Sequence, residues 1–129
     1  MPQSSPDPEC TVYVVDDDDG ARCALKFALE AGGFAVRAFS SANQILAETM
    51  PPDHSCLVTD YNMPGMDGLD VVDALRLRGN PVPAILVTGD PNRTVRDRAA
   101  AANVPVVEKW NSAENLVRCI HEVVKARMN

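Results

Sequence analysis

The chain has 129 residues, 46% of them apolar and 23% charged, and it carries a formal net charge of -6 at pH 7. This length fits one domain with one core, and the composition is ordinary for a soluble globular protein. The acidic balance, without any cluster of Lys and Arg, argues against an unaided nucleic-acid or acidic-membrane binder. No apolar run is long enough to span a bilayer.

The segment 1–9 has neither basic residues nor an apolar stretch, so we do not expect it to be a signal peptide. We predict that 1–9 is a disordered lead and that 10–129 forms a single domain. The cysteines lie far apart and form no C-x-x-C pair; they are Cys10, Cys23, Cys56 and Cys119. We interpret them as reduced packing residues of a cytoplasmic protein, neither ligands nor disulfides.

The predicted elements alternate between strands and helices from the first apolar run onward. The run 11–15 is β-rich and predicts a strand, and 21–31 carries a helical stripe that is closed by glycines. Segment 34–39 alternates like a second strand. Ser41, with Gln44 three residues later, is a capping-box pattern that begins a short second helix.

The remaining elements continue this alternation, with strands expected at 56–60, 83–88 and 104–108 and helices at 69–77, 91–103 and about 112–126. Pro91 is expected in the first turn of its helix, a position that suits proline. Pro105 indicates that its strand lies at a sheet edge, because proline cannot donate to the hydrogen-bond ladder.

Strands that alternate in this way with helices predict an α/β fold, a doubly wound five-stranded parallel sheet with five helices on both faces. Among doubly wound orders, the flavodoxin-like order 2-1-3-4-5 places the fifth strand at an edge, in agreement with Pro105. The same order makes the first and third strands neighbours where the strand order reverses. Open α/β sheets bind their ligands at the carboxyl ends of such strands.

In this order Asp16 and Asp17, which follow the first strand, face Asp60, which ends the third. Three carboxylates in one pocket repel one another, so we expect a cation there. The donors are all oxygens, and a small number of protein ligands favours Mg²⁺ over Ca²⁺. We predict Asp17 and Asp60 as direct ligands, Asp16 acting through water, and the backbone carbonyl of Asn62 as a further oxygen. The other two aspartates of the run 16–19 are interpreted as solvated helix-capping residues.

Two more polar side chains are expected at the same sheet edge. Thr88 ends the fourth strand with a hydroxyl, and Lys109 follows the fifth strand with an ammonium group. A single Thr or Lys at such a position is usually structural or solvated. Together, beside a metal ion, they would meet the spread negative charge of a phosphoryl group. Asp60 would then be a nucleophile that forms an acyl phosphate.

These residues resemble the signature of response-regulator receiver domains. The resemblance extends over about 11–124, and its most specific piece is Asp-x-x-Met-Pro-x-Met-Asp-Gly over 60–68. The other matching pieces follow in the family's order: Val14-Val15-Asp16-Asp17, Val87-Thr88-Gly89 and Glu108-Lys109. Segment 34–42, with Phe34-Ala35-Val36 and Phe39-Ser40-Ser41-Ala42, is similar to receivers of the nitrogen-fixation regulator type.

The resemblance implies that Asp60 accepts a phosphoryl group, with Mg²⁺ bound, from a sensor histidine kinase or a histidine phosphotransfer protein. It also implies that the fourth helix, fifth strand and fifth helix rearrange to change contacts with an unknown downstream protein or with a second copy in a homodimer. The chain is thus expected to be a cytoplasmic signalling phosphoprotein. Its only chemistry would be self-phosphorylation and self-dephosphorylation, without a nucleic-acid or membrane partner of its own.

Two positions depart from the family pattern. An aromatic residue usually lies three positions before the Lys, where this chain has Val106, and a Pro usually follows the Lys, where it has Trp110. Val106 removes the aromatic group of the usual Thr–aromatic switch, and Trp110 either covers the rim of the core or anchors a partner. A cis bond before a non-proline residue costs about 2.5–4 kcal/mol. We therefore expect a trans Lys109–Trp110 bond, a rearranged loop, and a Lys109 that closes on Asp60 only when phosphate arrives.

Other classes fit less well. A haloacid-dehalogenase-type phosphatase needs a general-acid Asp two residues after its nucleophile, but Asn62 stands there and an amide cannot protonate a leaving group. A flavodoxin-type flavin binder shares the strand order, but the acidic run 16–19 would repel the flavin phosphate. Since only 127–129 follow the last predicted helix, the chain is expected to be a stand-alone receiver. The alternative is the receiver part of a transcription factor whose DNA-binding domain lies outside this sequence.

Overall fold

The computed structural model describes residues 10–109 and 113–128 of the chain, and its core is a parallel sheet. The strands are β1 (Thr11–Val15), β2 (Ala35–Phe39), β3 (Ser55–Asp60), β4 (Ala84–Thr88) and β5 (Val106–Glu108). They lie in the order β2-β1-β3-β4-β5, and every pairing is parallel. The fold class and the strand order predicted from the sequence are therefore confirmed.

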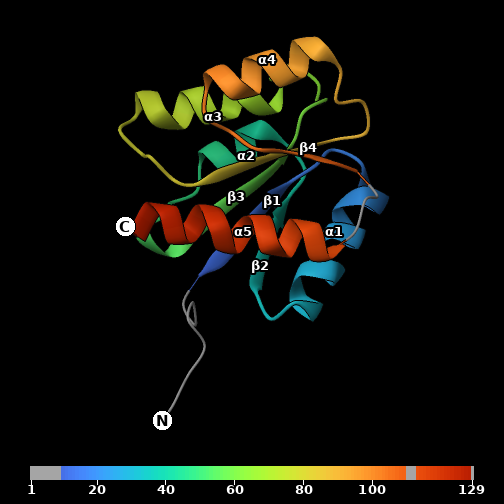
Figure 1. Cartoon of the computed structure of the whole chain (residues 1–129), viewed down its shortest axis with the longest axis vertical. Helices are drawn as coiled ribbons and strands as arrows, with labels where there is room; N and C mark the ends of the chain where they lie inside the picture. Colours follow the sequence, from blue (N-terminus) through green and yellow to red (C-terminus); the bar gives the residue numbers. More distant parts are fainter. Residues whose placement is uncertain (1–9, 110–112, 129) are drawn as a thin grey trace.

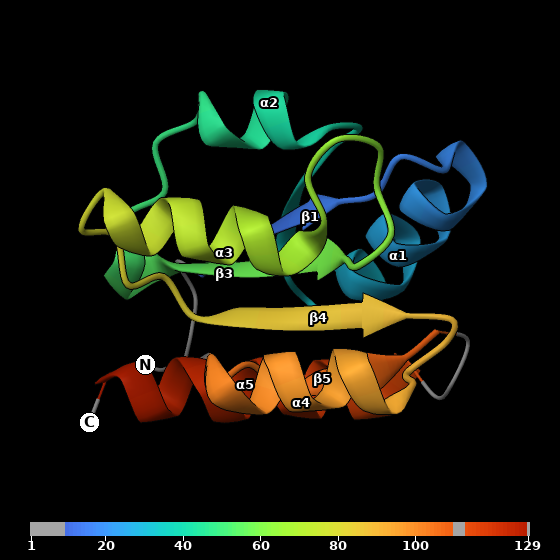
Figure 2. The same cartoon turned by 90° about the horizontal axis from the view of Figure 1, so that it is seen from above.

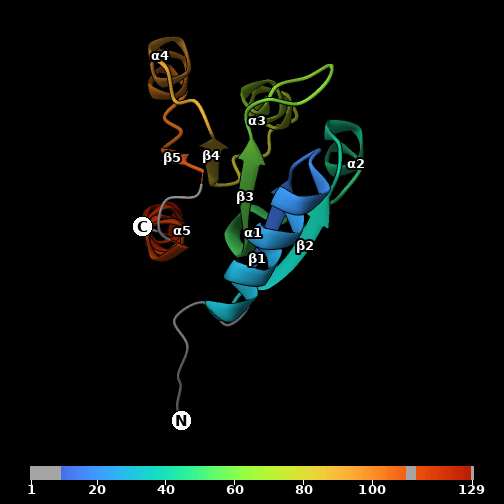
Figure 3. The same cartoon turned by 90° about the vertical axis from the view of Figure 1, so that its right-hand side faces the viewer.

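Helices connect the strands and cover both faces of the sheet (Figures 1 and 2). They are α1 (Asp19–Ala31), α2 (Ala42–Leu46), α3 (Gly68–Leu77), α4 (Arg93–Ala101) and α5 (Ala113–Met128), with a 3-10 turn η1 (Pro52–His54) before β3. Helices α1 and α5 lie on one face, and α2, α3 and α4 lie on the other (Figure 3). Each strand therefore lies between two helical layers.

Two apolar cores, one on each face, follow from the alternation of side chains along the strands. Val12 and Val14 of β1 pack with Leu29 of α1 in the first core, while Tyr13 and Val15 face the second core. Strand β3 is buried along its whole length. This double burial explains why the central strands are continuous apolar runs in the sequence. Each fully buried Leu, Ile or Val contributes about 1.5–3 kcal/mol to folding.

Helix capping shifts the helix starts from their predicted positions. Helix α1 begins at Asp19 because Asp18, at the N-cap, accepts a hydrogen bond from the Ala21 amide at 2.7 Å. The prediction that Pro91 lies in the first turn of α4 is wrong. Asn92 caps that helix instead, and its side chain accepts from the Val95 amide.

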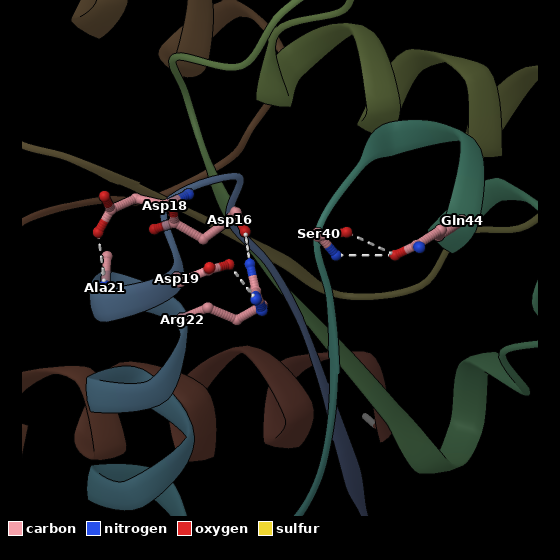
Figure 4. Close-up of polar contacts among 7 residues, drawn as sticks. All are labelled: Asp16, Asp18, Asp19, Ala21, Arg22, Ser40 and Gln44. Carbon is pink, nitrogen blue, oxygen red and sulfur yellow. Dashed lines mark hydrogen bonds and ion pairs between the residues drawn. The ribbon is translucent and has the colours of Figure 1, made fainter.

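Smaller corrections concern β5 and α2. Strand β5 is shorter than predicted, and Pro105 lies just before it, where its carbonyl accepts from the Leu86 amide. The capping box at α2 is half formed, because Ser41 Oγ accepts from the Gln44 amide at 3.2 Å. The Gln44 side chain accepts from the amide and hydroxyl of Ser40 instead of completing the box (Figure 4).

All four cysteines are free. Cys10 and Cys56 are buried and Cys119 is partly buried, as expected for packing residues, but Cys23 is exposed on α1, so that interpretation is wrong for Cys23. Among the described residues no helix is long and apolar enough to cross a membrane. The predicted lead 1–9, the Lys109–Trp110 bond and the expected helix start at Ser112 lie outside the described residues.

Candidate functional site

The carboxyl ends of β1 and β3 bring the first two predicted site residues together. Val15 and Thr59 are partners in the register of these neighbouring parallel strands, so the next residues, Asp16 and Asp60, leave the same sheet edge side by side. On the other side of β3, Asp60 is the partner of Val87 in β4. The topology alone therefore places Asp60 at the centre of the edge where α/β folds bind ligands.

One carboxylate oxygen from each of Asp16, Asp17 and Asp60 lies within 4.8 Å of the others. Asp16 and Asp60 are buried, with 0% and 4% of their surface exposed, whereas Asp17 faces solvent. The set thus has two fixed inner carboxylates and one outer carboxylate that a solvated ion could reach first. Grouping such like charges is unfavourable without positive charge nearby.

The turn after β1 fixes the direction of the Asp16 side chain. Asp16 Oδ1 accepts from the Asp18 amide at 2.9 Å, and Arg22 of α1 donates to the Asp16 carbonyl at 2.9 Å. Figure 4 shows this turn at the start of α1, where Asp19 pairs with Arg22. Asp18 and Asp19 are therefore helix-terminus residues, as interpreted from the sequence, and lie outside the acidic cluster.

Lys109 supplies positive charge inside the cluster. Its Nζ lies 3.0 Å from Asp16 Oδ2 and 3.1 Å from Asp60 Oδ1, and only 13% of its side chain is exposed. Its backbone amide donates to the carbonyl of Thr88 at 2.7 Å, which ties Lys109 itself to the end of β4. The expectation that Lys109 sits loosely before phosphorylation is wrong, because two buried carboxylates attract its ammonium group in this state.

Burial and ion pairing shift the pKa values of this pair in the folded protein. Burial raises the pKa of Asp60, Lys109 opposes that rise, and the neighbouring Asp16 adds to it, so the net shift is upward. Burial lowers the pKa of Lys109, but its bonds to Asp16 and Asp60 outweigh this effect and the net shift is again upward. Lys109 therefore remains an ammonium group at neutral pH.

Thr88 ends β4 at the same sheet edge and is fully buried. Its Oγ1 accepts from the Asp90 amide at 3.1 Å, so its own hydroxyl proton is available for donation elsewhere. Asn62 lies in the loop after β3 and is exposed. Thr88 follows Val87, the register partner of Asp60, and Asn62 comes two residues after Asp60 in the sequence. Their direct roles stay predictions.

The loop that follows Asp60 is closed at its base. The Gly68 amide donates to the Tyr61 carbonyl at 3.0 Å, and a Cβ added at Gly68 would lie 2.3 Å from the Asp60 carbonyl oxygen. Glycine is therefore required for this close approach. Asp67 caps α3 in a complete capping box with Asp70. The spacing Asp-x-x-Asp before an apolar run resembles a capping signature that the sequence analysis overlooked.

Arg98 of α4 is a second feature that the sequence analysis missed. Its Nη1 donates to Tyr61 Oη at 2.9 Å and to Asp67 Oδ2 at 2.7 Å, and Nη2 lies 3.6 Å from Asp70 Oδ1. Its guanidinium carbon lies 5.8 Å from the centroid of the Tyr61 ring. No pattern in the sequence distinguishes Arg98 from the other arginines of this helix, because only tertiary packing decides which of them turns toward the loop.

The donor set fits a hard divalent cation such as Mg²⁺. All three grouped residues offer carboxylate oxygens, the ligands that Mg²⁺ prefers. Within the described part of the chain, Asp16 Oδ2 is buried without a hydrogen bond of good geometry, although Lys109 Nζ gives it a charge partner at 3.0 Å. The ion pair balances the charge of this oxygen, and the missing hydrogen bond leaves it able to accept from a metal-bound water.

Comparison with known proteins agrees with these motifs. Residues 12–121 match the family model of the response regulator receiver domain. The chain is 43% identical over 89 residues to the transcriptional regulatory protein FixJ of Azorhizobium caulinodans, covering 69% of this chain and 40% of FixJ. It is 37% identical over 120 residues to the response regulator protein TmoT of Ectopseudomonas mendocina, covering 92% and 54%. It therefore spans about half, or less, of the length of these relatives.

Solved structures show the same architecture. The crystal structure of FixJ-N superposes with a TM-score of 0.81 at 31% identity, covering 90% of this chain and 94% of FixJ-N. The response regulator StyR superposes with a TM-score of 0.83 at 30% identity, covering 93% of this chain and 61% of StyR. The chain therefore belongs to the family of response regulator receiver domains.

Proposed function

We propose that Asp60 is the phosphoryl acceptor of this receiver, with a phosphohistidine on a sensor histidine kinase or a histidine phosphotransfer protein as the donor. The observation that supports this most directly is the position of Asp60. It is buried at the end of the central strand β3, within the carboxylate cluster, with Lys109 Nζ 3.1 Å away. In this proposal the receiver catalyses only its own phosphorylation and dephosphorylation at Asp60 and does not turn over an external substrate.

In this reaction a carboxylate oxygen of Asp60 attacks phosphorus while the phosphorus–nitrogen bond of the phosphohistidine breaks. The imidazole leaves with the bonding electron pair, and an acyl phosphate remains on Asp60. Asp17 and Asp60 directly, Asp16 through water and the carbonyl of Asn62 would hold Mg²⁺. When bound, the ion would supply positive charge for the phosphoryl oxygens.

Lys109 and Thr88 would complete the site from the neighbouring strand ends. The ammonium group of Lys109, which pairs with Asp16 and Asp60 in this state, can exchange one of these contacts for a phosphoryl oxygen. The hydroxyl of Thr88 can donate its proton to another phosphoryl oxygen. The Thr88 oxygen can keep its bond from the Asp90 amide, at the start of the connection to α4, while its hydroxyl proton is donated.

The output of this receiver is proposed to be a change in protein contacts in the cytoplasm, with a downstream protein or a second copy of the chain as partner. A second candidate is the receiver part of a transcription factor. It is supported by the relatives, because FixJ is a transcriptional regulatory protein of which this chain covers 40%. Phosphotransfer profiling against the histidine kinases of one genome would identify the donor for either candidate.

Labelling tests the acceptor assignment. With acetyl phosphate or a cognate phosphorylated kinase and Mg²⁺, the protein should gain one phosphoryl group in intact-mass spectrometry, and Asp60→Asn should gain none. Asp73→Asn, which changes an exposed carboxylate on the adjacent helix α3, is the matched control and should label like the wild type. Persistent labelling of Asp60→Asn at another residue would refute the assignment.

A further inference from the structure

Arg98 differs from the other arginines of α4 in what its side chain reaches. Arg93 is almost fully exposed beside Asp97 on its own helix, and Arg96 donates to the nearby Pro91 carbonyl. Arg98 instead reaches two residues of the loop after β3, Tyr61 and Asp67, which lie 37 and 31 positions away in the sequence. It is thus a tertiary link between helix α4 and that loop.

The two partners of Arg98 lie at opposite ends of the loop. Tyr61 directly follows the proposed acceptor, and Asp67 is the N-cap of α3. The base of the loop is also closed through the backbone, by the bond from the Gly68 amide to the Tyr61 carbonyl. The proposed carbonyl ligand, Asn62, lies between these two attachment points. The guanidinium group therefore limits how far the two ends of this loop can separate.

We propose that Arg98 is a positioning residue, which holds the loop 61–67 in the shape that binds the cation and couples that shape to helix α4. This inference rests on the proposed function. Arg98 touches neither the carboxylate cluster nor the phosphoryl group in this proposal, and it acts through Tyr61 and Asp67. Because coupling between sites is reciprocal, a cation bound at the cluster would in turn favour the α4 position that Arg98 sets.

A positioning role of Arg98 and a simple effect of its charge predict opposite changes in Mg²⁺ affinity when Arg98 is replaced. Replacing Arg98 by Ala removes a positive charge near a cation site, which by electrostatics alone would tighten Mg²⁺ binding. If Arg98 positions the loop, the same substitution should weaken Mg²⁺ binding. Arg93→Ala removes the same charge from the same helix without touching the loop, and it is therefore the matched control.

The experiment is a Mg²⁺ titration of the full chain, followed by backbone amide shifts in NMR spectra without any phosphoryl donor. Tyr61→Phe, which deletes one hydroxyl under Arg98, should weaken Mg²⁺ binding about threefold, and Arg98→Ala about tenfold. Arg93→Ala should bind Mg²⁺ at least as tightly as the wild type. In the wild type Mg²⁺ should shift the amides of α4, and in Arg98→Ala these shifts should be lost while those at Asp17 remain.

The double variant Tyr61→Phe/Arg98→Ala tests whether the two side chains act together or separately on Mg²⁺ binding. If the two side chains act as one unit, its Mg²⁺ affinity should equal that of Arg98→Ala and not the product of both effects. Unchanged or tighter Mg²⁺ binding in Arg98→Ala, or additive effects in the double variant, would overturn the inference while leaving Asp60 as acceptor. A wild type that neither binds Mg²⁺ nor accepts phosphate would overturn the proposed function itself.

Discussion

At the scale of single residues, Lys109 carries the charge balance of the site. Lys109→Met would leave Asp16 and Asp60 buried without their shared cation, and removing one partner of a buried ion pair costs about 3–5 kcal/mol. Without Mg²⁺ we expect the free energy of unfolding to fall by up to that amount, and Mg²⁺ to bind more tightly because no ammonium group competes with it. Urea denaturation with and without Mg²⁺ measures both effects.

The control for Lys109→Met is Lys26→Met, which removes an exposed ion pair with Glu30 on α1. Exposed pairs contribute about 0–1 kcal/mol, so Lys26→Met should change stability little and leave Mg²⁺ binding unchanged. If Lys109→Met unfolds like the wild type in the absence of Mg²⁺, the ammonium group does not balance the buried carboxylates.

Gly68 is the residue where the backbone comes closest to the acceptor. A Cβ there would lie 2.3 Å from the Asp60 carbonyl oxygen and 2.8 Å from Leu86 Cδ1, and neither the strand nor the core side chain can move away freely. We expect Gly68→Ala to destabilise the fold by about 1–3 kcal/mol or more, as overpacking does. Gly89→Ala, where a Cβ meets nothing within 4 Å, is the control in the same urea experiment. Equal stability of the two variants would contradict the close approach.

The sequence predicts the positions of those site residues that lie at the end of a strand or directly after it. Asp16, Asp60 and Lys109 each follow or end a strand, so the topology alone brought them to one sheet edge. The contact of Lys109 with Asp60 does not follow from the geometry of the Lys109–Trp110 bond, because the attraction of two buried carboxylates decides where the ammonium group lies. Arg98 could not be predicted, since its direction depends on how α4 packs against the loop.

At the scale of elements, the start of α4 depends on the Asn92 cap. The Asn92 side chain accepts from the Val95 amide at 3.1 Å, and replacing an N-cap residue of this kind by Ala costs about 0.5–2 kcal/mol. Asn92→Ala should therefore lower the free energy of unfolding by about 1 kcal/mol and speed amide exchange in the first turn of α4. Thr94→Ala, an exposed position in the same turn, is the control. Unchanged exchange in Asn92→Ala would show that packing alone fixes the helix start.

Strands were easier to predict than helix starts for a physical reason. The central strands are buried on both faces, so apolar runs such as β3 reveal them. Helix starts depend on which of several neighbouring polar residues satisfies the first amides, and Pro91 and Asn92 compete for that position. The structure selects Asn92, and likewise Asp18 for α1, because their side-chain oxygens reach the free amides.

At the scale of the whole molecule, the pKa of Asp60 links folding stability to pH. Burial raises this pKa above its ordinary value of 3.8, with the Asp16 charge adding to the shift and Lys109 opposing it. The folded state therefore holds a proton on Asp60 more tightly than the unfolded state does. Stability consequently falls as pH rises from 3.8 through the folded pKa, and that loss persists at neutral pH. Asp67 acts in the opposite sense. Burial alone would raise its pKa, but the bonds from Arg98 and from backbone amides outweigh burial and lower it. The stability that Asp67 contributes is therefore lost as pH falls.

The difference between Asp60→Asn and the wild type isolates the contribution of Asp60. Without Mg²⁺, Asp60→Asn should become more stable than the wild type as pH rises from 3.8 through the pKa of Asp60 in the folded state. Above that pH, the difference in the free energy of unfolding should stay constant up to neutral pH. Adding Mg²⁺ should stabilise only the wild type, because a ligand that binds the folded state raises stability by mass action. Urea denaturation from acidic to neutral pH, with and without Mg²⁺ and with Asp73→Asn as the exposed control, measures this. If the stability difference changes with neither pH nor Mg²⁺, the charge of Asp60 does not oppose folding and Asp60 does not bind the cation.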